Sequence, residues 1–214
     1  MWFKTDFVQI CGVDDAGRGS MVGPLVISGI SIHKNKIGKL SMLGVKDSKQ
    51  LSSTSREELY DQIIKTVDNY YTIRIPPKSI DASVRKHNLN HLEAKYMAKV
   101  ISRLNPNLSY VDSCDVDYRR FGREIMQITG NKNIKSYHHA DSRFIVVSAA
   151  SIIAKVTRDR SIDRLRKNHN LGSGYPSDSL TVNYIESYYK THKILPSFVR
   201  KSWKPAQKIL NLKL

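Results

Sequence analysis

Short apolar runs bounded by glycine, proline and polar residues predict five β-strands in the first two thirds of the chain. They cover residues 7–14, 23–32, 70–75, 108–111 and 134–138. The connection between the first two strands is short and rich in glycine, which favours a hairpin, and Pro76 and Pro77 end the third strand. Three strands therefore follow one another as a meander, and the last two alternate with helices.

Apolar residues at helical spacing predict four helices around these strands. They cover residues 53–67, 92–104, 118–128 and 144–167, and Thr54 is the expected N-cap of the first. Beyond residue 170 the pattern indicates turns and short helices interrupted by prolines. The order predicts an α/β fold with a mixed five-stranded sheet flanked by helices over residues 1–170, and a small basic helical domain over residues 171–214.

Four aspartates fall at the ends of the predicted strands. Asp14 and Asp15 end the first strand, Asp112 ends the fourth, and Asp141 lies between the fifth strand and the long helix. If the first and fourth strands are neighbours, their acids meet at the carboxyl edge of the sheet, where sites of α/β proteins form. A lone aspartate at a strand end is more often a turn or helix cap. Four in this order favour a site for a hard cation such as Mg²⁺, since buried carboxylates without a cation are costly.

The net charge of the chain indicates which class of molecule such a site acts on. The chain has 35 Lys and Arg against 19 Asp and Glu, a formal net charge of +16, which indicates a polyanionic partner and above all nucleic acid. No acidic residue follows Glu186, whereas seven Lys and Arg do. A basic tail of this kind can equally be an ordinary solvated surface, so by itself it decides nothing.

Several classes of protein are disfavoured by what the sequence lacks. It shows no apolar run of membrane-spanning length, signal peptide, repeat or low-complexity tract, which predicts a cytoplasmic, monomeric protein with no membrane partner. Cys11 and Cys114 are too few for a disulfide framework or a zinc site. With Asp14 and Asp112 level on parallel strands, these cysteines are expected roughly 16 Å apart, too far for a disulfide.

Five motifs occur in order along the chain. They are GVDDAGRG at 12–19, GVKDSK at 44–49, YVD at 110–112, AD at 140–141 followed by VSAASIIAK at 147–155, and GSGYPSD at 172–178. In this combination the chain resembles type 2 ribonuclease H, or ribonuclease HII, in its compact archaeal form. The resemblance covers nearly the whole chain and implies a ribonuclease H-like sheet with a small helical C-terminal domain.

The resemblance also implies roles for particular residues. The catalytic and metal-binding residues would be Asp14, Asp15, Asp112 and Asp141, with two Mg²⁺ or Mn²⁺ ions as cofactors. The backbone of Gly17, Arg18 and Gly19 would approach the ribose 2′-hydroxyl, and Tyr175 would stack on the following deoxyribose. Glycine suits a close backbone approach, and the 2′-hydroxyl is what separates RNA from DNA. Without the acids before it, a Gly-Arg-Gly segment would be interpreted as a tight turn.

Other polar segments are open to two interpretations. Lys46, Ser48 and Lys49 can hold phosphate oxygens or form an ordinary exposed loop. Ser148 and Lys155 on the long helix are weaker candidates, because small residues at this spacing more often indicate close packing of helix on sheet.

Two positions depart from the family pattern. Asp15 stands where the family usually has Glu, so its carboxylate is one methylene shorter. Because adjacent strand residues project to opposite faces, Asp14 and Asp15 cannot bind one metal in the same way, and we expect activity to persist with an altered rate or metal preference. His138 and His139 replace a Glu-x-Lys segment, and an inert surface histidine is as good an interpretation of His139 as a basic contact.

The activity implied is metal-dependent hydrolysis of the RNA strand of RNA/DNA hybrids, and incision 5′ of ribonucleotides embedded in duplex DNA, leaving 3′-hydroxyl and 5′-phosphate ends. Two alternatives remain, a ribonuclease HIII-like nuclease without junction preference and a non-catalytic basic nucleic-acid-binding protein. A sliding clamp is a further partner to consider, but residues 208–214 lack the Gln-x-x-hydrophobic-x-x-aromatic-aromatic pattern of a clamp-binding peptide.

Overall fold

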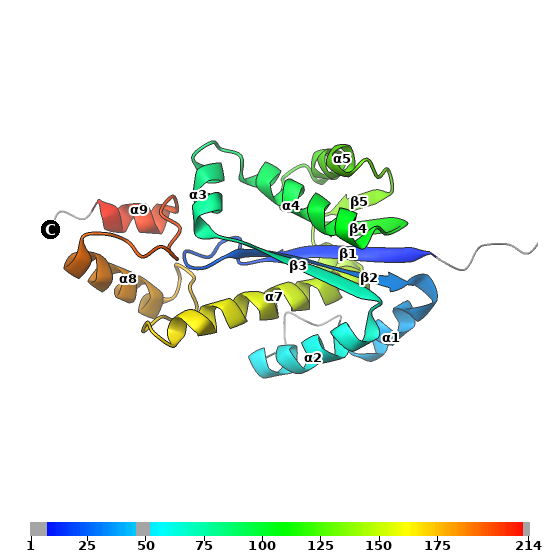
Figure 1. Cartoon of the computed structure of the whole chain (residues 1–214), viewed down its shortest axis with the longest axis horizontal. Coiled ribbons are helices and arrows are strands. Elements are labelled where there is room, and N and C mark those ends of the chain that lie inside the picture. The colour runs from blue at the N-terminus through cyan, green and yellow to red at the C-terminus, as the bar shows by residue number, and fades with distance from the viewer. Residues whose placement is uncertain (1–7, 46–51, 212–214) are drawn as a thin grey trace, which may run out of the picture. The chain divides into compact units, whose positions relative to one another are not determined.

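The computed structural model describes residues 8–45 and 52–211. Its elements, labelled in Figure 1, are β1 (Gln9–Ala16), β2 (Leu25–His33), the 3₁₀ turn η1 (Lys34–Lys36), α1 (Ile37–Met42), α2 (Ser53–Thr66), β3 (Asn69–Ile75), α3 (Pro77–Val84), α4 (Leu89–Leu104), β4 (Leu108–Asp112), α5 (Tyr118–Thr129), β5 (Ile134–Tyr137), α6 (Ala140–Arg143), α7 (Ile145–Arg166), α8 (Ser179–His192) and α9 (Lys204–Leu210).

The five predicted strands form one sheet in the order β3-β2-β1-β4-β5, which confirms the predicted fold class. The meander of β1, β2 and β3 makes one half of the sheet. β4 then pairs with β1 in parallel, with Val13 opposite Val111, and β5 pairs with β4 in parallel. The expected neighbourhood of the first and fourth strands is therefore correct, and it decides where the acids lie.

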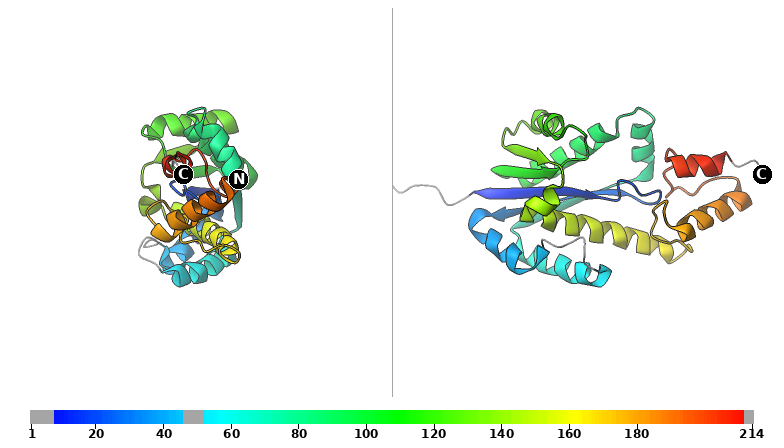
Figure 2. Two further views of the ribbon diagram at one scale, coloured as in Figure 1. Left: turned by 90° about the vertical axis from the view of Figure 1, so that its left-hand side faces the viewer. Right: turned by 180° about the vertical axis from the view of Figure 1, so that it is seen from behind.

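Helices cover both faces of this sheet. α4 and α5 lie on one face, whereas α1, α2 and the first half of α7 lie on the other (Figure 2). The core on the α7 side is built from branched apolar side chains that include Ile30, Ile32 and Val147. Gly12 permits the close approach of α7, because a Cβ atom there would come within 2.2 Å of the Val146 carbonyl group.

The protein divides into two compact units that interleave in sequence. The first comprises residues 1–16, 27–73 and 90–156, and the second comprises residues 17–26, 74–89 and 157–214. Within the second unit, a separate core gathers around Met21, Ile162 and Ile185. The expected division into domains at residues 170 and 171 is contiguous, unlike these units, and it stays a prediction.

Some local predictions were wrong. The segment beyond residue 170 contains the 14-residue helix α8, not only short helices, because Asp178 caps it and accepts a hydrogen bond from the Leu180 N–H (3.0 Å). β3 ends at Ile75, before Pro76 and Pro77, as predicted. Pro77 then begins α3, a helix that was not predicted, at a position where its missing N–H costs nothing. The N-cap of α2 is Ser52, whose Oγ accepts the Ser55 N–H (3.1 Å), while Thr54 lies inside the helix.

None of the helices within residues 8–45 and 52–211 combines the length and the apolar character of a membrane-crossing segment.

Cys11 and Cys114 both lie within the described residues, and neither forms a disulfide bond. Cys11 is fully buried on β1, and its burial raises the pKa of the thiol to about 12. The half-buried Cys114 thiol donates to Glu93 Oε2 (3.0 Å).

Thiol titration of the unreduced protein in denaturant is therefore expected to find two sulfhydryls. In the native protein Cys11 should stay unreactive until the chain unfolds, because the reactive thiolate is suppressed. Recovery of fewer than two thiols in denaturant without reductant would contradict the predicted separation of the cysteines.

Candidate active site

Asp14 and Asp112 lie level with each other at the carboxyl ends of adjacent strands. Val13 on β1 is paired with Val111 on β4, so the next residue of each strand is an aspartate. Neighbouring strands lie about 4.8 Å apart, which brings the two carboxyl groups onto the same face within strong electrostatic range. This juxtaposition is what the order of strands and acids predicted.

The Asp14 carboxyl is the buried centre of the site. Its side chain is only 5% exposed, and burial together with the charges of Asp112 and Asp141 raises its pKa to about 7. The Ser151 hydroxyl on α7 and the Asp15 N–H partly offset this rise, the latter by donating to Asp14 Oδ1 (2.7 Å). The structure therefore brings Asp112 and Asp141, two of the other predicted acids, within electrostatic range of Asp14.

One hydrogen bond holds the Asp112 carboxylate, and another holds the backbone of Asp141. The Ala140 N–H at the start of α6 donates to Asp112 Oδ1 (2.6 Å). The Ser148 hydroxyl on α7 donates to the Asp141 carbonyl oxygen. These bonds tie β4, α6 and α7 together around the acids, so Ser148 has a positioning role that does not require contact with a phosphate.

Asp15 contributes differently from its neighbour. It is more exposed than Asp14, and the alternation of a strand directs its side chain to the opposite face. Its backbone N–H nevertheless orients the Asp14 carboxylate, as the hydrogen bond above shows. This backbone contribution is independent of whether position 15 carries Asp or Glu.

The two departing histidines are part of the turn that leads into α6. His139 has a left-handed backbone (φ 53°), and its carbonyl accepts the Ser142 hydroxyl (2.7 Å). Histidine tolerates this conformation better than most residues other than glycine. His138 Nε2 lies 2.7 Å from the Asp115 carbonyl oxygen. Both residues thus have a structural part in the turn that precedes α6, the helix that carries Asp141.

The donor set fits a divalent metal ion of the Mg²⁺ type. Within the described residues, no three His, Cys, Asp or Glu side chains form a ready cage for a metal. Mg²⁺ commonly takes one or two carboxylates and completes its shell with water and substrate oxygens, so such a cage is not required. Burial first, and then the negative charges of Asp112 and Asp141, raise the pKa of Asp14, and a bound cation would offset both effects.

In the second compact unit, the Gly17–Arg18–Gly19 loop and the Tyr175 loop are joined. Gly17 has φ 82°, and the Met21 N–H donates to the Gly174 carbonyl (2.9 Å). The half-buried Tyr175 ring is covered on one side by the Arg158 guanidinium, whose Cζ lies 4.4 Å from the ring centroid. The two segments assigned to ribose recognition therefore lie together in this unit.

Two buried arginines support these loops and were missed by sequence reasoning. Arg158 is 5% exposed and donates to Ser20 Oγ (2.8 Å) and to the Ser173 carbonyl (2.5 Å). Arg200 is fully buried and donates to the carbonyls of Arg18 (2.8 Å) and Gly23 (3.1 Å). A signal existed for Arg158, because it continues a polar stripe on α7 at helical spacing. Arg200 had none beyond the basic tail.

The remaining candidates are less defined. Lys46, Ser48 and Lys49 lie outside the described residues. Lys155 is partly buried on α7, and its contact with phosphate stays a prediction.

Comparison with known proteins decides the family. The chain matches the family model described as Ribonuclease HII over residues 11–206. The chain belongs to the ribonuclease HII family. It is 54% identical to a ribonuclease HII of Cenarchaeum symbiosum over 94% of this chain and 97% of the relative. This membership makes it an endoribonuclease of the ribonuclease HII class, as the motifs predicted, and sets aside the ribonuclease HIII alternative.

Solved ribonuclease HII structures agree with the fold. The ribonuclease H2 of Pyrococcus horikoshii superposes with a TM-score of 0.88 at 44% identity, over 95% of this chain and 97% of that one. A structure of the PCNA:RNase HII complex from Archaeoglobus fulgidus contains a chain with a TM-score of 0.86 at 39% identity, over 92% of this chain and 96% of that one.

Proposed function

We propose that this ribonuclease HII is a metal-dependent enzyme that cuts the RNA strand of RNA/DNA hybrids and incises 5′ of single ribonucleotides in duplex DNA, in the cytoplasm. The observation that carries the proposal is the placement of Asp14 and Asp112 at the carboxyl ends of paired strands, where burial and the charges of Asp112 and Asp141 raise the pKa of Asp14. A cluster of buried carboxylates at the carboxyl edge of a sheet, in a chain with net charge +16, suits a cation that binds phosphate.

Asp14 and Asp112 would hold the ions, with Asp141 and a carboxylate or backbone oxygen of Asp15 completing the set. Mg²⁺ or Mn²⁺ supplies a water of lowered pKa and stabilises the leaving 3′-oxygen when it is bound. The chain's own part is to aim the carboxylates. The N–H groups of Asp15 and Ala140 do this for Asp14 and Asp112. No nucleophilic side chain is needed, and the products carry 3′-hydroxyl and 5′-phosphate ends.

Recognition of the ribose is assigned to the joined loops of the second unit. The left-handed Gly17 leaves the backbone of Gly17, Arg18 and Gly19 without a bulky side chain at its first position, which suits a close approach to a 2′-hydroxyl. The uncovered part of the Tyr175 ring offers a stacking surface for the next sugar. Arg158 and Arg200 keep these loops in place from behind.

A sliding clamp stays a further candidate partner. The Archaeoglobus fulgidus relative forms a complex with PCNA. Residues 208–214 of this chain nevertheless lack the corresponding peptide pattern.

The decisive experiment is product mapping on a DNA duplex that contains one ribonucleotide, with Mg²⁺ and with EDTA. The expected result is a single cut 5′ of the ribonucleotide, on its own strand, only when the metal is present. A protein that binds the duplex equally with and without metal and never cuts it would instead be a basic nucleic-acid-binding protein. Cutting of long hybrids alone would indicate a nuclease without junction preference.

Position 15 yields a separate prediction. Asp15→Glu should leave the enzyme active and change the ratio of its Mg²⁺ and Mn²⁺ activities, since the added methylene re-aims the carboxylate while the N–H bond to Asp14 remains. Metal titrations of both proteins measure this ratio. Complete inactivation would mean that the site is built around the shorter acid.

A further inference from the structure

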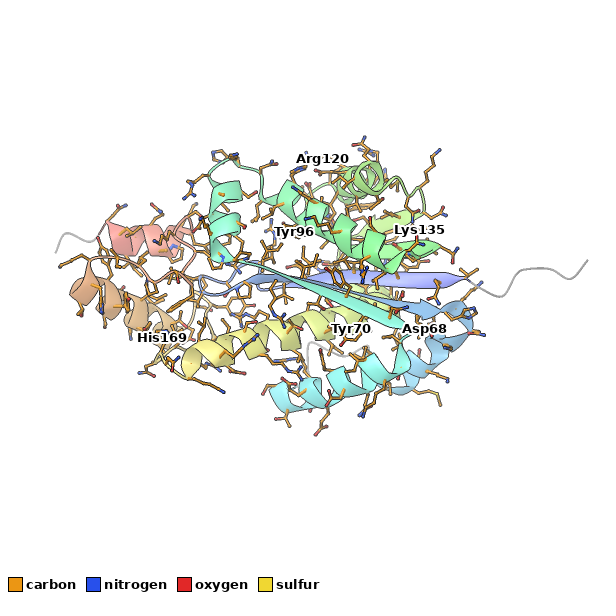
Figure 3. The ribbon with its side chains drawn as sticks, viewed as in Figure 1. Asp68, Tyr70, Tyr96, Arg120, Lys135 and His169 are labelled. Carbon is orange, nitrogen blue, oxygen red and sulfur yellow. The ribbon has the colours of Figure 1, made fainter. Side chains whose placement is uncertain are left out.

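A basic groove lies between α5 and the edge strand β5, outside the carboxylate cluster. Its volume is about 480 Å³. The residues that line it are Tyr118, Arg119, Gly122, Arg123, Met126, Ile134, Lys135, Ser136 and Tyr137. Lys135 belongs to the β5 side of the groove (Figure 3), and β5 is the last strand of the sheet on this side.

The charge of this groove has one sign. Arg119, Arg123 and Lys135 are exposed, and no acidic residue is among the described residues that line it. Acids near α5 are occupied elsewhere. Asp115 accepts two hydrogen bonds from Arg120 (2.6 and 2.7 Å), and Glu124 Oε1 lies 2.5 Å from His91 Nδ1.

Asp117 is the acid that remains close to this basic cluster. Its Oδ1 accepts the N–H groups of Arg119 and Arg120 as the cap of α5, and Arg123 helps to lower its pKa. One capping carboxylate leaves an excess of positive charge at the mouth of the groove, which favours an anionic ligand.

A second observation comes from the floor of the groove. Ser136 is 7% exposed, and its Oγ has no hydrogen-bond partner among the described residues. Buried hydroxyls are rarely left in this state, so a group or water that enters with a ligand can complete it. Gly122 lines the floor opposite, where an added Cβ would lie 3.1 Å from that of Ser136.

The position of the groove connects it to the carboxylates. Tyr137 at its near end is paired with Asp112 across the β4–β5 ladder. Ile134, at the far end of β5, is three residues before Tyr137. At about 4.8 Å between strands and about 3.3 Å per residue along the strand, it lies about 11 Å from Asp112, which corresponds to about three nucleotides at about 3.4 Å per step.

We propose that this groove binds the phosphodiester backbone of the substrate duplex, within about three nucleotides of the cleaved linkage. The proposal rests on the proposed function for the class of its ligand. The three cations neutralise phosphates without reading sequence or sugar, so the groove supplies affinity and register.

The test compares two triple variants of equal charge. The groove variant loses the three cations of the groove through Arg119→Gln, Arg123→Gln and Lys135→Gln. The control variant loses three exposed lysines of η1, α1 and α2, away from the groove, through Lys34→Gln, Lys39→Gln and Lys65→Gln. Both lower the formal net charge from +16 to about +13. Affinity for a ribonucleotide-containing duplex is measured in EDTA, so that the readout needs no cleavage and survives failure of the proposed activity.

The groove variant is expected to bind about tenfold more weakly and to lower the slope of log affinity against log salt by about 0.9 for each phosphate that is no longer neutralised. In the control variant, the affinity for the duplex and its salt slope should change much less. Neutral methylphosphonates are then placed singly along the duplex. At one or two positions near the cleaved linkage, the methylphosphonate should weaken duplex binding by the native protein. The same substitution should leave binding by the groove variant unchanged.

Equal effects of the two variants would overturn the proposal, because only net charge would then matter. So would methylphosphonate sensitivity that is identical in the native protein and the groove variant at every position. If inorganic phosphate binds the native protein and not the groove variant, while the duplex scan shows no such coupling, the groove holds a free anion and the proposal is wrong.

Discussion

Replacing Asp14 by Asn is expected to lower cleavage by orders of magnitude and, in the same protein, to stabilise the metal-free fold at neutral pH. The loss of cleavage follows because the substitution removes charge from the shared cation site. Asp112→Asn should act similarly, and Asp141→Asn should do less if it holds only the second metal. Single-turnover rates with Mg²⁺ measure this effect.

The gain in stability follows from the sign of the pKa shift. The folded protein holds the Asp14 proton up to about pH 7, whereas an unfolded aspartate releases it near its ordinary pKa of 3.8. The unfolded state therefore binds fewer protons between these values, and the free energy of unfolding falls as the pH rises through this window. Each pKa unit is worth about 1.4 kcal/mol, so the cost reaches a few kcal/mol above pH 7.

Denaturant unfolding in EDTA at about pH 4 and about pH 8 checks this linkage. Asp14→Asn should match the native protein at the acid pH and exceed it at the alkaline pH. Asp61→Asn, an exposed change on α2, is the matched control and should alter neither cleavage nor the pH profile. Near-parental cleavage by Asp14→Asn with Mg²⁺ would refute the proposed mechanism, whatever its stability.

Tyr175→Ala is expected to slow cleavage at a single embedded ribonucleotide more than cleavage of a long hybrid. A stacked ring contributes about 1–3 kcal/mol, so the loss should approach tenfold or more. Tyr175→Phe is the matched control, because it keeps the ring over the Arg158 guanidinium. It should retain most of the activity on both substrates.

Lys201→Ala with Lys204→Ala supplies the contrast. Both lysines are exposed, and phosphate contacts carry no information about ribose. This double variant should lower the cleavage rate on both substrates by the same factor, and it should make that rate less dependent on salt concentration. Rates of each variant on both substrates at two salt concentrations make the comparison. Equal losses on both substrates for Tyr175→Ala would leave Tyr175 as a packing residue that covers Arg158.

The strands, their order and the meeting of Asp14 with Asp112 could be predicted from the sequence. Apolar periodicity is a local property, and a parallel pair of strands places the residues after Val13 and Val111 side by side. The family motifs identified the same acids independently. Element boundaries were less accurate, as the Ser52 N-cap of α2 shows, because capping depends on one hydrogen bond.

What only the tertiary structure decided depends on residues far apart in the chain. The raised pKa of Asp14 requires burial and two carboxylates from other elements. Arg158 is held by Ser20, 138 residues away, and Arg200 by the carbonyl of Arg18, 182 residues away. From a local sequence pattern, an arginine is predicted to be exposed. Its burial is favourable only when acceptors from distant parts of the chain hydrogen-bond to its guanidinium, and a local pattern does not show them. The sequence by itself therefore determined which acids meet at the edge of the sheet, and the fold determined which charges are buried around them.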